Sequence, residues 1–195
     1  PNKPLLISEF GIRADGVNVY GTPTQGDALA KQKQYFTDFF AALRTRPWVS
    51  GASLWTFNDY RSRFPGTNPD GYRWWGLVDP SRNRRPAYAW VRAELSPAIL
   101  GDASVNRETV TMDLKTRADF PAYTLRGYRA RWVWLDDSGR ELKTSEDALP
   151  DLPPGSIRQL QKACPAGAAA VRVEVVRPTG FTMMDRRYEL HEKNR

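Results

Sequence analysis

The chain of 195 residues is poor in the residues that build metal and disulfide sites. It contains one cysteine, Cys164, and one histidine, His191, so it offers neither an internal disulfide nor the Cys/His set of a zinc site. No apolar run approaches the ~20 residues that a membrane-spanning helix needs, and no signal peptide opens the chain. We therefore expect no metal, no cofactor and no membrane partner. Because the sequence does not begin with methionine, we also expect that its natural N-terminus lies upstream or has been removed.

The charge balance is basic, with 29 lysines and arginines against 22 aspartates and glutamates and a net charge of +7. Such a balance can indicate a protein that binds nucleic acid. Here the arginines are spread along the chain, and like charges cluster no further than pairs such as Arg84-Arg85 and Arg186-Arg187. This favours a solvated arginine-rich surface and no nucleic-acid partner. A hydrophobic content of 41% predicts a globular protein rather than a disordered one.

The first half of the chain alternates predicted strands and helices. A short buried strand is predicted at residues 5–8, and a second one at residues 49–57 in "VSGASLWTF". Between them Phe36, Phe40 and Leu43 recur at helical spacing, and Pro86 suits the first turn of another helix, which we predict to reach residue 95. Strand, helix, strand, helix is the order of parallel β/α units. Two such units cannot close a barrel, which suggests a part of a larger domain.

The second half is rich in predicted strands. The stretch "YRARWVWL" alternates Tyr128, Trp132 and Trp134 with Arg129 and Arg131, so one face is aromatic and faces a core. Strands are predicted at residues 107–114, 128–135, 159–163, 169–176 and 183–190, and the division between the halves is placed at residues 96–106. Many short strands with a buried tryptophan in a central one indicate an immunoglobulin-like or fibronectin-like sandwich.

One acidic residue stands where catalysis would need it. Glu9 in "LLISEFG" ends the first predicted strand, and Trp55 lies near the end of the second. In β/α barrels the catalytic side chains lie at the C-terminal ends of strands, and a carboxylate held there can act as a nucleophile or as an acid/base. Five aromatic residues follow on the second strand and its loop, which fits sugar binding because a pyranose packs its C–H faces on an indole. They are Trp55, Tyr60, Tyr72, Trp74 and Trp75. A core role for these rings and a surface role for Glu9 are the alternatives.

Three motifs resemble the end of the catalytic barrel of glycoside hydrolase family 2. They are "ISEFG", "GASLWTFNDYRS" and "GYRWWGLVDPSRNRRPAYAWV", in this order over residues 4–95. The resemblance implies an α/β plus all-β chain, in which the last two β/α units of a TIM (β/α)8 barrel precede an immunoglobulin/fibronectin-like β-sandwich. The barrel portion would span residues 1–97 and the sandwich residues 104–195.

The same resemblance implies roles for individual residues. Glu9 matches the nucleophile at the end of the seventh barrel strand, and Trp55 matches a tryptophan that lines the subsite of the sugar being cleaved off. Asn58, Asp59 and Tyr60 fall in the following stretch and are expected to contact substrate. β-Glucuronidases of the family carry an Asn-x-Lys where this chain reads "YRWWG", so Arg73 stands in the place of the asparagine and could pair with a sugar carboxylate.

The resemblance therefore implies an exo-acting retaining β-glycosidase of the β-galactosidase type acting on a carbohydrate substrate. β-Glucuronidase and β-mannosidase of the same family are alternatives, and so is a non-catalytic carbohydrate-binding or structural module. A bacterial polysaccharide-degrading enzyme of this kind is expected in the periplasm or outside the cell slightly more than in the cytoplasm. A homo-oligomer is a further possibility.

One element of the chemistry is absent from the sequence. A retaining glycosidase needs two carboxyl groups about 5–5.5 Å apart, one as nucleophile and one as acid/base. The acid/base of the family belongs to an Asn-Glu pair, and this chain contains no Asn-Glu. We therefore expect that an N-terminal part of the parent enzyme supplies it and that the 195-residue chain is inactive alone.

Overall fold

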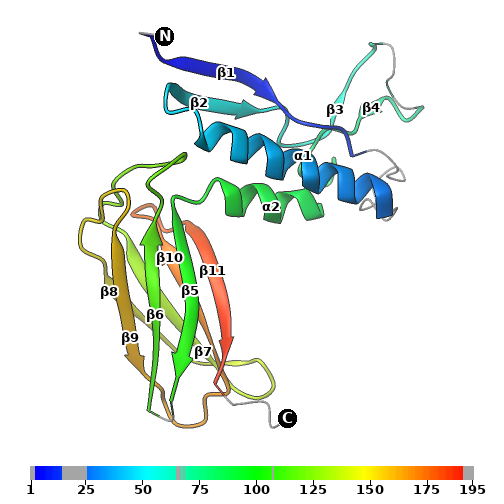
Figure 1. Cartoon of the computed structure of the whole chain (residues 1–195). Coiled ribbons are helices and arrows are strands. Elements are labelled where there is room, and N and C mark those ends of the chain that lie inside the picture. Colours follow the sequence, from blue (N-terminus) through cyan, green and yellow to red (C-terminus); the bar gives the residue numbers. More distant parts are fainter. Residues whose placement is uncertain (1–2, 15–25, 65–66, 68, 107, 191–195) are drawn as a thin grey trace. The chain divides into compact units, whose positions relative to one another are not determined.

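The computed structural model describes residues 3–14, 26–64, 67, 69–106 and 108–190, and the chain divides into two compact units, Pro1–Leu95 and Ser96–Arg195. Figure 1 shows the helices in the first unit and a β-sandwich in the second. No helix among the described residues is long and apolar enough to cross a membrane.

The described residues of the first unit form one pair of parallel strands and two helices. Strands β1 (Leu5–Phe10) and β2 (Val49–Leu54) pair in parallel, and helix α1 (Gly26–Arg44) connects them along the chain. A second, antiparallel pair is formed by β3 (Tyr60–Arg61) and β4 (Tyr72–Arg73), and helix α2 (Pro86–Glu94) follows and packs on α1. The predicted order of strand, helix, strand and helix is therefore present, and the described residues of this unit form no closed barrel.

Helix α1 holds β1 through a cluster of phenylalanines. Phe36, Phe40 and Leu43 recur at helical spacing and are buried. The ring of Phe10 stacks on Phe39 with centroids 4.0 Å apart and meets Phe36 edge-on at 6.5 Å. Burying these rings contributes to the packing of β1 on α1.

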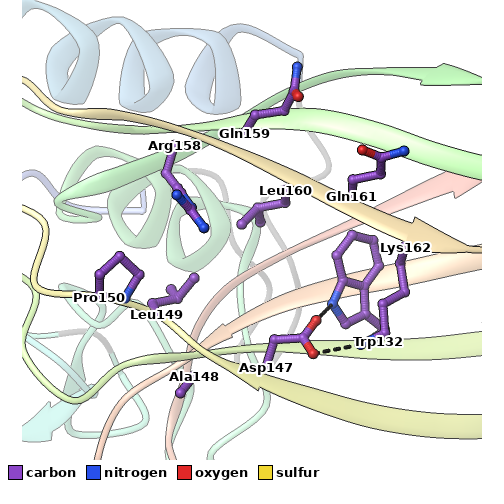
Figure 2. Close-up of a pocket in the computed structure, with 10 residues that line it drawn as sticks. All are labelled: Trp132, Asp147, Ala148, Leu149, Pro150, Arg158, Gln159, Leu160, Gln161 and Lys162. Carbon is purple, nitrogen blue, oxygen red and sulfur yellow. Dashed lines mark hydrogen bonds and ion pairs between the residues drawn. The ribbon is translucent and has the colours of Figure 1, made fainter.

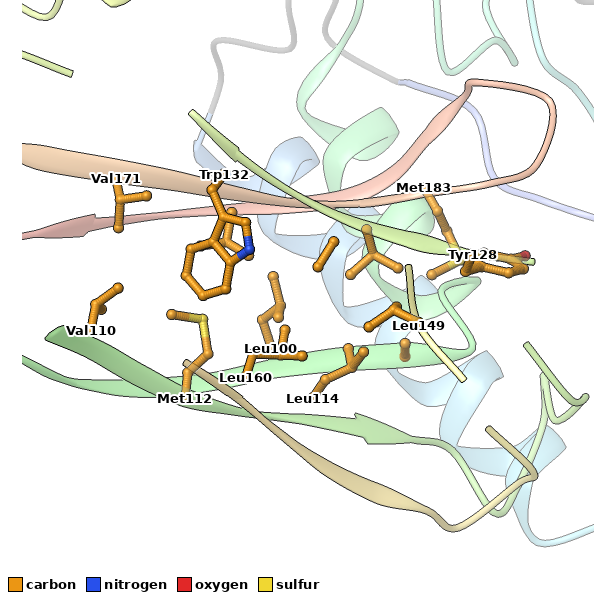
Figure 3. Close-up of a cluster of buried hydrophobic side chains, with 14 of the residues drawn as sticks. Leu100, Val110, Met112, Leu114, Tyr128, Trp132, Leu149, Leu160, Val171 and Met183 are labelled. Atoms are coloured by element: carbon orange, nitrogen blue, oxygen red, sulfur yellow. The ribbon is translucent and has the colours of Figure 1, made fainter. Parts of the chain in front are cut away.

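The second unit is a sandwich of a three-stranded and a four-stranded antiparallel sheet. The first sheet has the order β5-β6-β9 and the second has the order β11-β10-β7-β8. The strands are β5 (Ala98–Val105), β6 (Thr109–Thr116), β7 (Arg129–Leu135), β8 (Glu141–Ala148), β9 (Ile157–Ala163), β10 (Ala170–Val176) and β11 (Thr182–Glu189). Side chains of both sheets point toward one another and fill the space between them (Figure 3).

The predicted alternation in the central strand is confirmed on its aromatic face. Tyr128, Trp132 and Trp134 are 7%, 1% and 1% exposed, whereas Arg129 and Arg131 are only partly buried. The opposite face differs from the expectation. The same alternation places Val133 and Leu135 on the face of the arginines, but both are buried, in a small cluster with Ala170 of β10. On this face the side chains of the two paired strands lie beside them, among them Ala170, the register partner of Leu135.

Two strands of the sandwich were not predicted. Strand β5 occupies residues that the sequence suggested as a connection, and an irregularity between Leu100 and Ala103 breaks its alternation. Strand β8 is an edge strand of mostly exposed polar residues, so no apolar period marks it. Both strands depend on pairing with β6 and β7, which local sequence does not reveal.

The turn between β7 and β8 leads to a prediction about acid stability. Asp136 accepts hydrogen bonds from the backbone and hydroxyl of Ser138 and from the backbone of Arg140, and these bonds lower its pKa from 3.8 to about 2. A carboxyl whose pKa is lower in the folded state stabilises the fold above its unfolded pKa and loses this effect as the pH falls through its folded pKa. We expect Asp136→Asn to flatten the decrease in unfolding free energy between about pH 4 and about pH 2, measured by urea unfolding. Identical acid slopes in the variant and the unmodified chain would contradict this.

Candidate functional site

The strand ends place Glu9 and Trp55 at the same edge of the parallel pair, as predicted. Glu9 is the penultimate residue of β1, and Trp55 directly follows β2. Phe10 and Leu54 are register partners, and the backbone N–H of Trp55 donates to the carbonyl of Phe10 at 2.7 Å. The carboxyl ends of parallel strands are where β/α proteins hold their ligands.

Local structure turns Glu9 away from the helix. Phe10 is anchored against the aromatic residues of α1 and is buried, whereas Glu9 before it is exposed. Gly11 then allows a close approach of the two strand ends, because a β-carbon at this position would overlap the carbonyl oxygen of Trp55. The backbone N–H of Gly11 donates to the hydroxyl of Tyr35 at 3.0 Å. These contacts explain the "EFG" motif as a strand end that presents one carboxylate.

A pocket of about 400 Å³ opens beside this carboxylate. Its volume lies in the range of small-molecule sites, about 300–1,000 Å³. The described residues that line it come from strand ends, α1 and the β3–β4 pair; they are Glu9, Phe10, Gly11, Tyr35, Trp55, Tyr60, Arg73 and Trp75. Among these residues Glu9 is the single acid and Arg73 the single base. The pocket thus combines one carboxylate with an aromatic wall and one cation.

Trp55 and Tyr60 form an ordered part of the aromatic wall. The indole Nε1–H of Trp55 donates to the hydroxyl of Tyr60 at 3.2 Å, and the two rings meet edge-on with centroids 5.4 Å apart. Trp55 nevertheless remains 41% exposed. An exposed indole fixed by a hydrogen bond offers an apolar surface to a ligand at little cost in side-chain entropy.

Arg73 contributes the positive charge of the pocket. It lies in β4, opposite Tyr60 of β3, and its guanidinium carbon is 5.8 Å from the centroid of the Trp75 ring. The Nε of Arg73 and the Nε1 of Trp75 are both buried and have no hydrogen-bond partner in the described structure. Buried donors without acceptors are uncommon in folded proteins, and these two atoms are closed to solvent.

The structure corrects the expected substrate contact of Asp59. Its carboxylate is enclosed and forms a two-point ion pair with Arg85, with N–O distances of 2.6 and 2.8 Å. It also accepts the backbone N–H of Gly76 at 2.9 Å. The side chains of Asp59 and Arg85 are 0% and 2% exposed. A carboxylate satisfied in this way holds the loop together and is not open to a sugar.

Asn58 is likewise occupied by neighbours in the chain. Its Oδ1 accepts from Arg82 at 2.8 Å and its amide donates to the carbonyl of Asp59 at 2.7 Å. It is not among the residues that line the pocket. Of the six residues predicted for the site, the structure therefore brings Glu9, Trp55, Tyr60 and Arg73 together and places Asn58 and Asp59 in the supporting loop.

Sequence reasoning missed the contribution of α1 to this pocket. Tyr35 lines it and fixes the backbone of Gly11, yet in the sequence it is one aromatic residue beside Phe36 in an amphipathic helix. The one sequence signal for Tyr35 is its place directly before Phe36, beside the buried phenylalanine face of the helix. A hydroxyl there satisfies an N–H at the strand end, which a phenylalanine could not do.

A second pocket, of about 270 Å³, lies in the sandwich between the edge strands β8 and β9. Figure 2 shows Asp147 joining the two strands. Its carboxylate accepts from the indole of Trp132 at 2.9 Å and from Lys162 at 2.6 Å. Charged residues on edge strands are a common means of blocking edge-to-edge aggregation, and these contacts satisfy Asp147 within the chain. This pocket therefore has a structural explanation.

No metal site is evident in the part of the chain that the structure describes, where no three residues of the types His, Cys, Asp and Glu are grouped to hold an ion. Burial raises the pKa of the Cys164 thiol, which makes it less reactive than an exposed thiol. We therefore assign the candidate chemistry to the pocket beside Glu9, which will be called the Glu9 pocket.

The fold and the pocket define a parallel β/α segment with a carboxylate and aromatic residues at its strand ends, followed in the chain by a β-sandwich. No protein-family model matches the sequence, and no curated protein matches it. Among solved structures, a β-D-mannosidase from Dictyoglomus thermophilum is similar over 95% of this chain and 27% of its own, with 12% identity and a TM-score of 0.38. An exo-chitosanase from Amycolatopsis orientalis is similar over 83% of this chain and 18% of its own, with 14% identity and a TM-score of 0.33.

Glycosidases are not the sole kind of neighbour. An endonuclease/exonuclease/phosphatase protein from Beutenbergia cavernae is similar over 48% of this chain and 24% of its own, with 18% identity and a TM-score of 0.28. This chain spans about a quarter or less of the length of each of these proteins. The neighbours thus include glycosidases, but similarities this distant do not assign an activity.

Proposed function

We propose that this chain is the C-terminal part of an exo-acting retaining β-glycosidase in which Glu9 is the nucleophile. The observation that supports this most is the meeting of Glu9 and Trp55 in one pocket, at the carboxyl ends of two adjacent parallel strands. This is where (β/α)8 barrels place their catalytic residues. The resemblance of three motifs to glycoside hydrolase family 2 gives Glu9 and Trp55 the same roles.

In the proposed mechanism Glu9 attacks the anomeric carbon of the terminal sugar. The bond from that carbon to the leaving oxygen breaks, and the alcohol takes a proton from the acid/base carboxyl. Water then attacks the glycosyl ester of Glu9, gives its proton to the same acid/base, and releases the sugar with its original configuration. Trp55 and Tyr60 would hold the apolar face of the sugar while this occurs.

We further propose that the acid/base carboxyl and the remaining barrel strands come from chain outside these 195 residues. Among the described residues that line the Glu9 pocket there is no second acid, and Asp59 is enclosed by its ion pair. The exposure of two leucines in strand β1 also supports this proposal, since the side chains of Leu5 and Leu6 are 48% and 66% exposed. Strands of parallel sheets are normally covered on both faces, and their backbone edges are normally paired.

We infer the identity of the substrate's sugar from the resemblance, which favours a β-galactoside over a β-glucuronide or a β-mannoside. A non-catalytic sugar-binding role for the sandwich is a second candidate function. Its support is that Tyr123 and Phe181 are 39% and 54% exposed and both contact Arg177. Sugar binding that survives in a sandwich-only protein would favour this second role.

The proposal is tested by assaying the purified chain on nitrophenyl β-galactoside, β-glucuronide and β-mannoside, alone and mixed with the upstream part of the protein. We expect no turnover by the chain alone, because proton donation to the leaving group is worth ~10²–10⁴-fold and the strands that position the sugar are absent. Turnover should appear on mixing and should disappear again with Glu9→Gln.

Two outcomes would contradict parts of the proposal. Turnover by the isolated chain would mean that a carboxyl within these 195 residues acts as acid. Asp15, which lies outside the described residues, would be the first to replace. Turnover of the mixture that persists with Glu9→Gln would mean that Glu9 is not the nucleophile.

A further inference from the structure

Two aromatic rings stand exposed at one end of the sandwich. The turn after β10 and the loop before β7 lie at the same end, because Val176 and Arg129 are register partners. The turn leads to Phe181, which is 54% exposed, and the loop carries Tyr123, which is 39% exposed. The other described tyrosines and tryptophans of the sandwich are at most 7% exposed; they are Tyr128, Trp132, Trp134 and Tyr188. The core of the sandwich therefore does not explain why these two rings are present.

One arginine joins the two rings. The Nη2 of Arg177 donates to the hydroxyl of Tyr123 at 3.3 Å, and its guanidinium carbon lies 5.9 Å from the centroid of the Phe181 ring. Among the residues that the structure describes, no carboxylate pairs with Arg177. Its Nε is closed to solvent, whereas its Nη1 is not closed off and has no partner in the same part of the chain. This terminal nitrogen is therefore open to an oxygen of a bound molecule.

Both segments that carry the rings are fixed by backbone contacts. Leu125, two residues after Tyr123, is buried and exchanges two backbone hydrogen bonds with Leu152, at 3.0 and 3.1 Å. In the turn, the backbone N–H of Arg177 donates to the carbonyl of Phe181 at 2.9 Å. Rings on fixed segments lose little further conformational entropy when a ligand covers them, so less of the contact energy is lost on binding.

We propose that Tyr123, Arg177 and Phe181 form a second sugar site, which binds a pyranose within a neutral β-linked polysaccharide chain. A pyranose offers an apolar C–H face to a ring and hydroxyl oxygens to an N–H donor, and this surface presents both partners side by side. A protein partner would need about 800 Å² on each side, far more than two rings and one guanidinium supply. The choice of a β-glycan rests on the proposed function, whereas binding at this surface does not require Glu9. A chain held here keeps its ends at a raised local concentration around the protein.

The test is affinity electrophoresis of the intact polypeptide through gels that contain soluble β-1,4-galactan, in its Glu9→Gln form so that no polysaccharide is consumed. We expect the galactan to retard the protein. Phe181→Ala and Tyr123→Ala should each weaken binding about 2- to 10-fold, the range of an aromatic contact. Arg177→Met should weaken it about 10-fold or more, because a hydrogen bond from a charged group is lost and the two rings lose the residue that joins them.

Ile157→Ala is the matched control. Ile157 lies in β9 of the same unit and is 64% exposed, so this variant removes an exposed apolar side chain that is not aromatic. It should leave the retardation unchanged, and an equal loss in this variant would overturn the second sugar site. Because Phe181 is more than half exposed, its replacement should also leave the thermal transition unchanged. Phe181→Ala therefore decides the test even if the variants of Tyr123 and Arg177 are destabilised.

The outcomes separate this inference from the proposed function. Retardation that needs Phe181 and survives Trp55→Ala, in a protein that hydrolyses no glycoside with Glu9 intact, supports the inference and contradicts the proposed function. Retardation that is lost in Trp55→Ala and kept in Phe181→Ala would assign the polysaccharide to the Glu9 pocket alone and overturn the second sugar site. The absence of any retardation would overturn it as well. Retardation by polygalacturonate without retardation by galactan would mean that the positive charge attracts anions, which contradicts a neutral chain.

Discussion

Under the proposed function, replacing Glu9 by glutamine in the full-length protein is expected to lower kcat on aryl β-glycosides by on the order of 10⁴–10⁶-fold, the loss seen when a nucleophile is removed from a covalent site. The amide has the shape of the carboxylate but cannot form the glycosyl ester. KM should change far less, since the aromatic wall and Arg73 are untouched. Initial-rate kinetics on nitrophenyl glycosides measure both constants.

Chemical rescue provides a second test of this role. Glu9→Ala leaves space beside the anomeric carbon, and azide there can attack in place of the carboxylate. Azide should restore turnover and give a glycosyl azide of the α configuration, because a single displacement inverts the anomeric centre. Glu94→Gln is a suitable control, since Glu94 lies in α2 and pairs with Arg44 outside the pocket. Azide that fails to accelerate Glu9→Ala, or a product of retained configuration, would argue against a nucleophilic Glu9.

The second large effect is expected for stability. Asp59→Asn should lower the free energy of unfolding of the first unit by about 3–5 kcal/mol, because it leaves the enclosed guanidinium of Arg85 without its counter-charge. Arg85 also donates to the carbonyls of Gly76 and Val78 at 2.9 and 3.2 Å, so its displacement would release the loop that leads to α2. Urea unfolding followed by tryptophan fluorescence measures the change.

Two variants make this test specific. Glu94→Gln breaks an ion pair of the same unit whose side chains are 18% and 28% exposed, and it should cost less than about 1 kcal/mol. The double variant Asp59→Asn/Arg85→Gln removes both charges, and it should recover part of the loss that the single variant shows. If Asp59→Asn unfolds like the unmodified chain but weakens substrate binding, the substrate contact expected from the motifs is right and the structural role is wrong.

Local sequence patterns determined several of the strands of this protein and the faces on which their residues lie. The alternation of Tyr128, Trp132 and Trp134 with arginines determined which residues of the central sandwich strand face the core, because side chains of a strand alternate whatever its partners are. In the same way, one short apolar run led to Glu9 and a second one carried Trp55 near its end, and the parallel pairing of β1 and β2 brought the two residues together. These predictions required only knowledge of the residues in each segment.

The remaining features depended on partners far away in the chain. Strands β5 and β8 exist because β6 and β7 pair with them, so their own polar or irregular sequences carried no signal. Asp59 and Asn58 stand next to Tyr60 in sequence, yet Arg85, 26 positions later, encloses Asp59 and keeps its carboxylate away from the pocket. Tyr35 reaches the pocket because α1 packs on β1, and the two donors of Arg73 and Trp75 prove unsatisfied only once every neighbour is in place. Alternation is a property of adjacent residues, whereas enclosure and hydrogen-bond satisfaction are properties of all residues around a site, and those the tertiary structure decided.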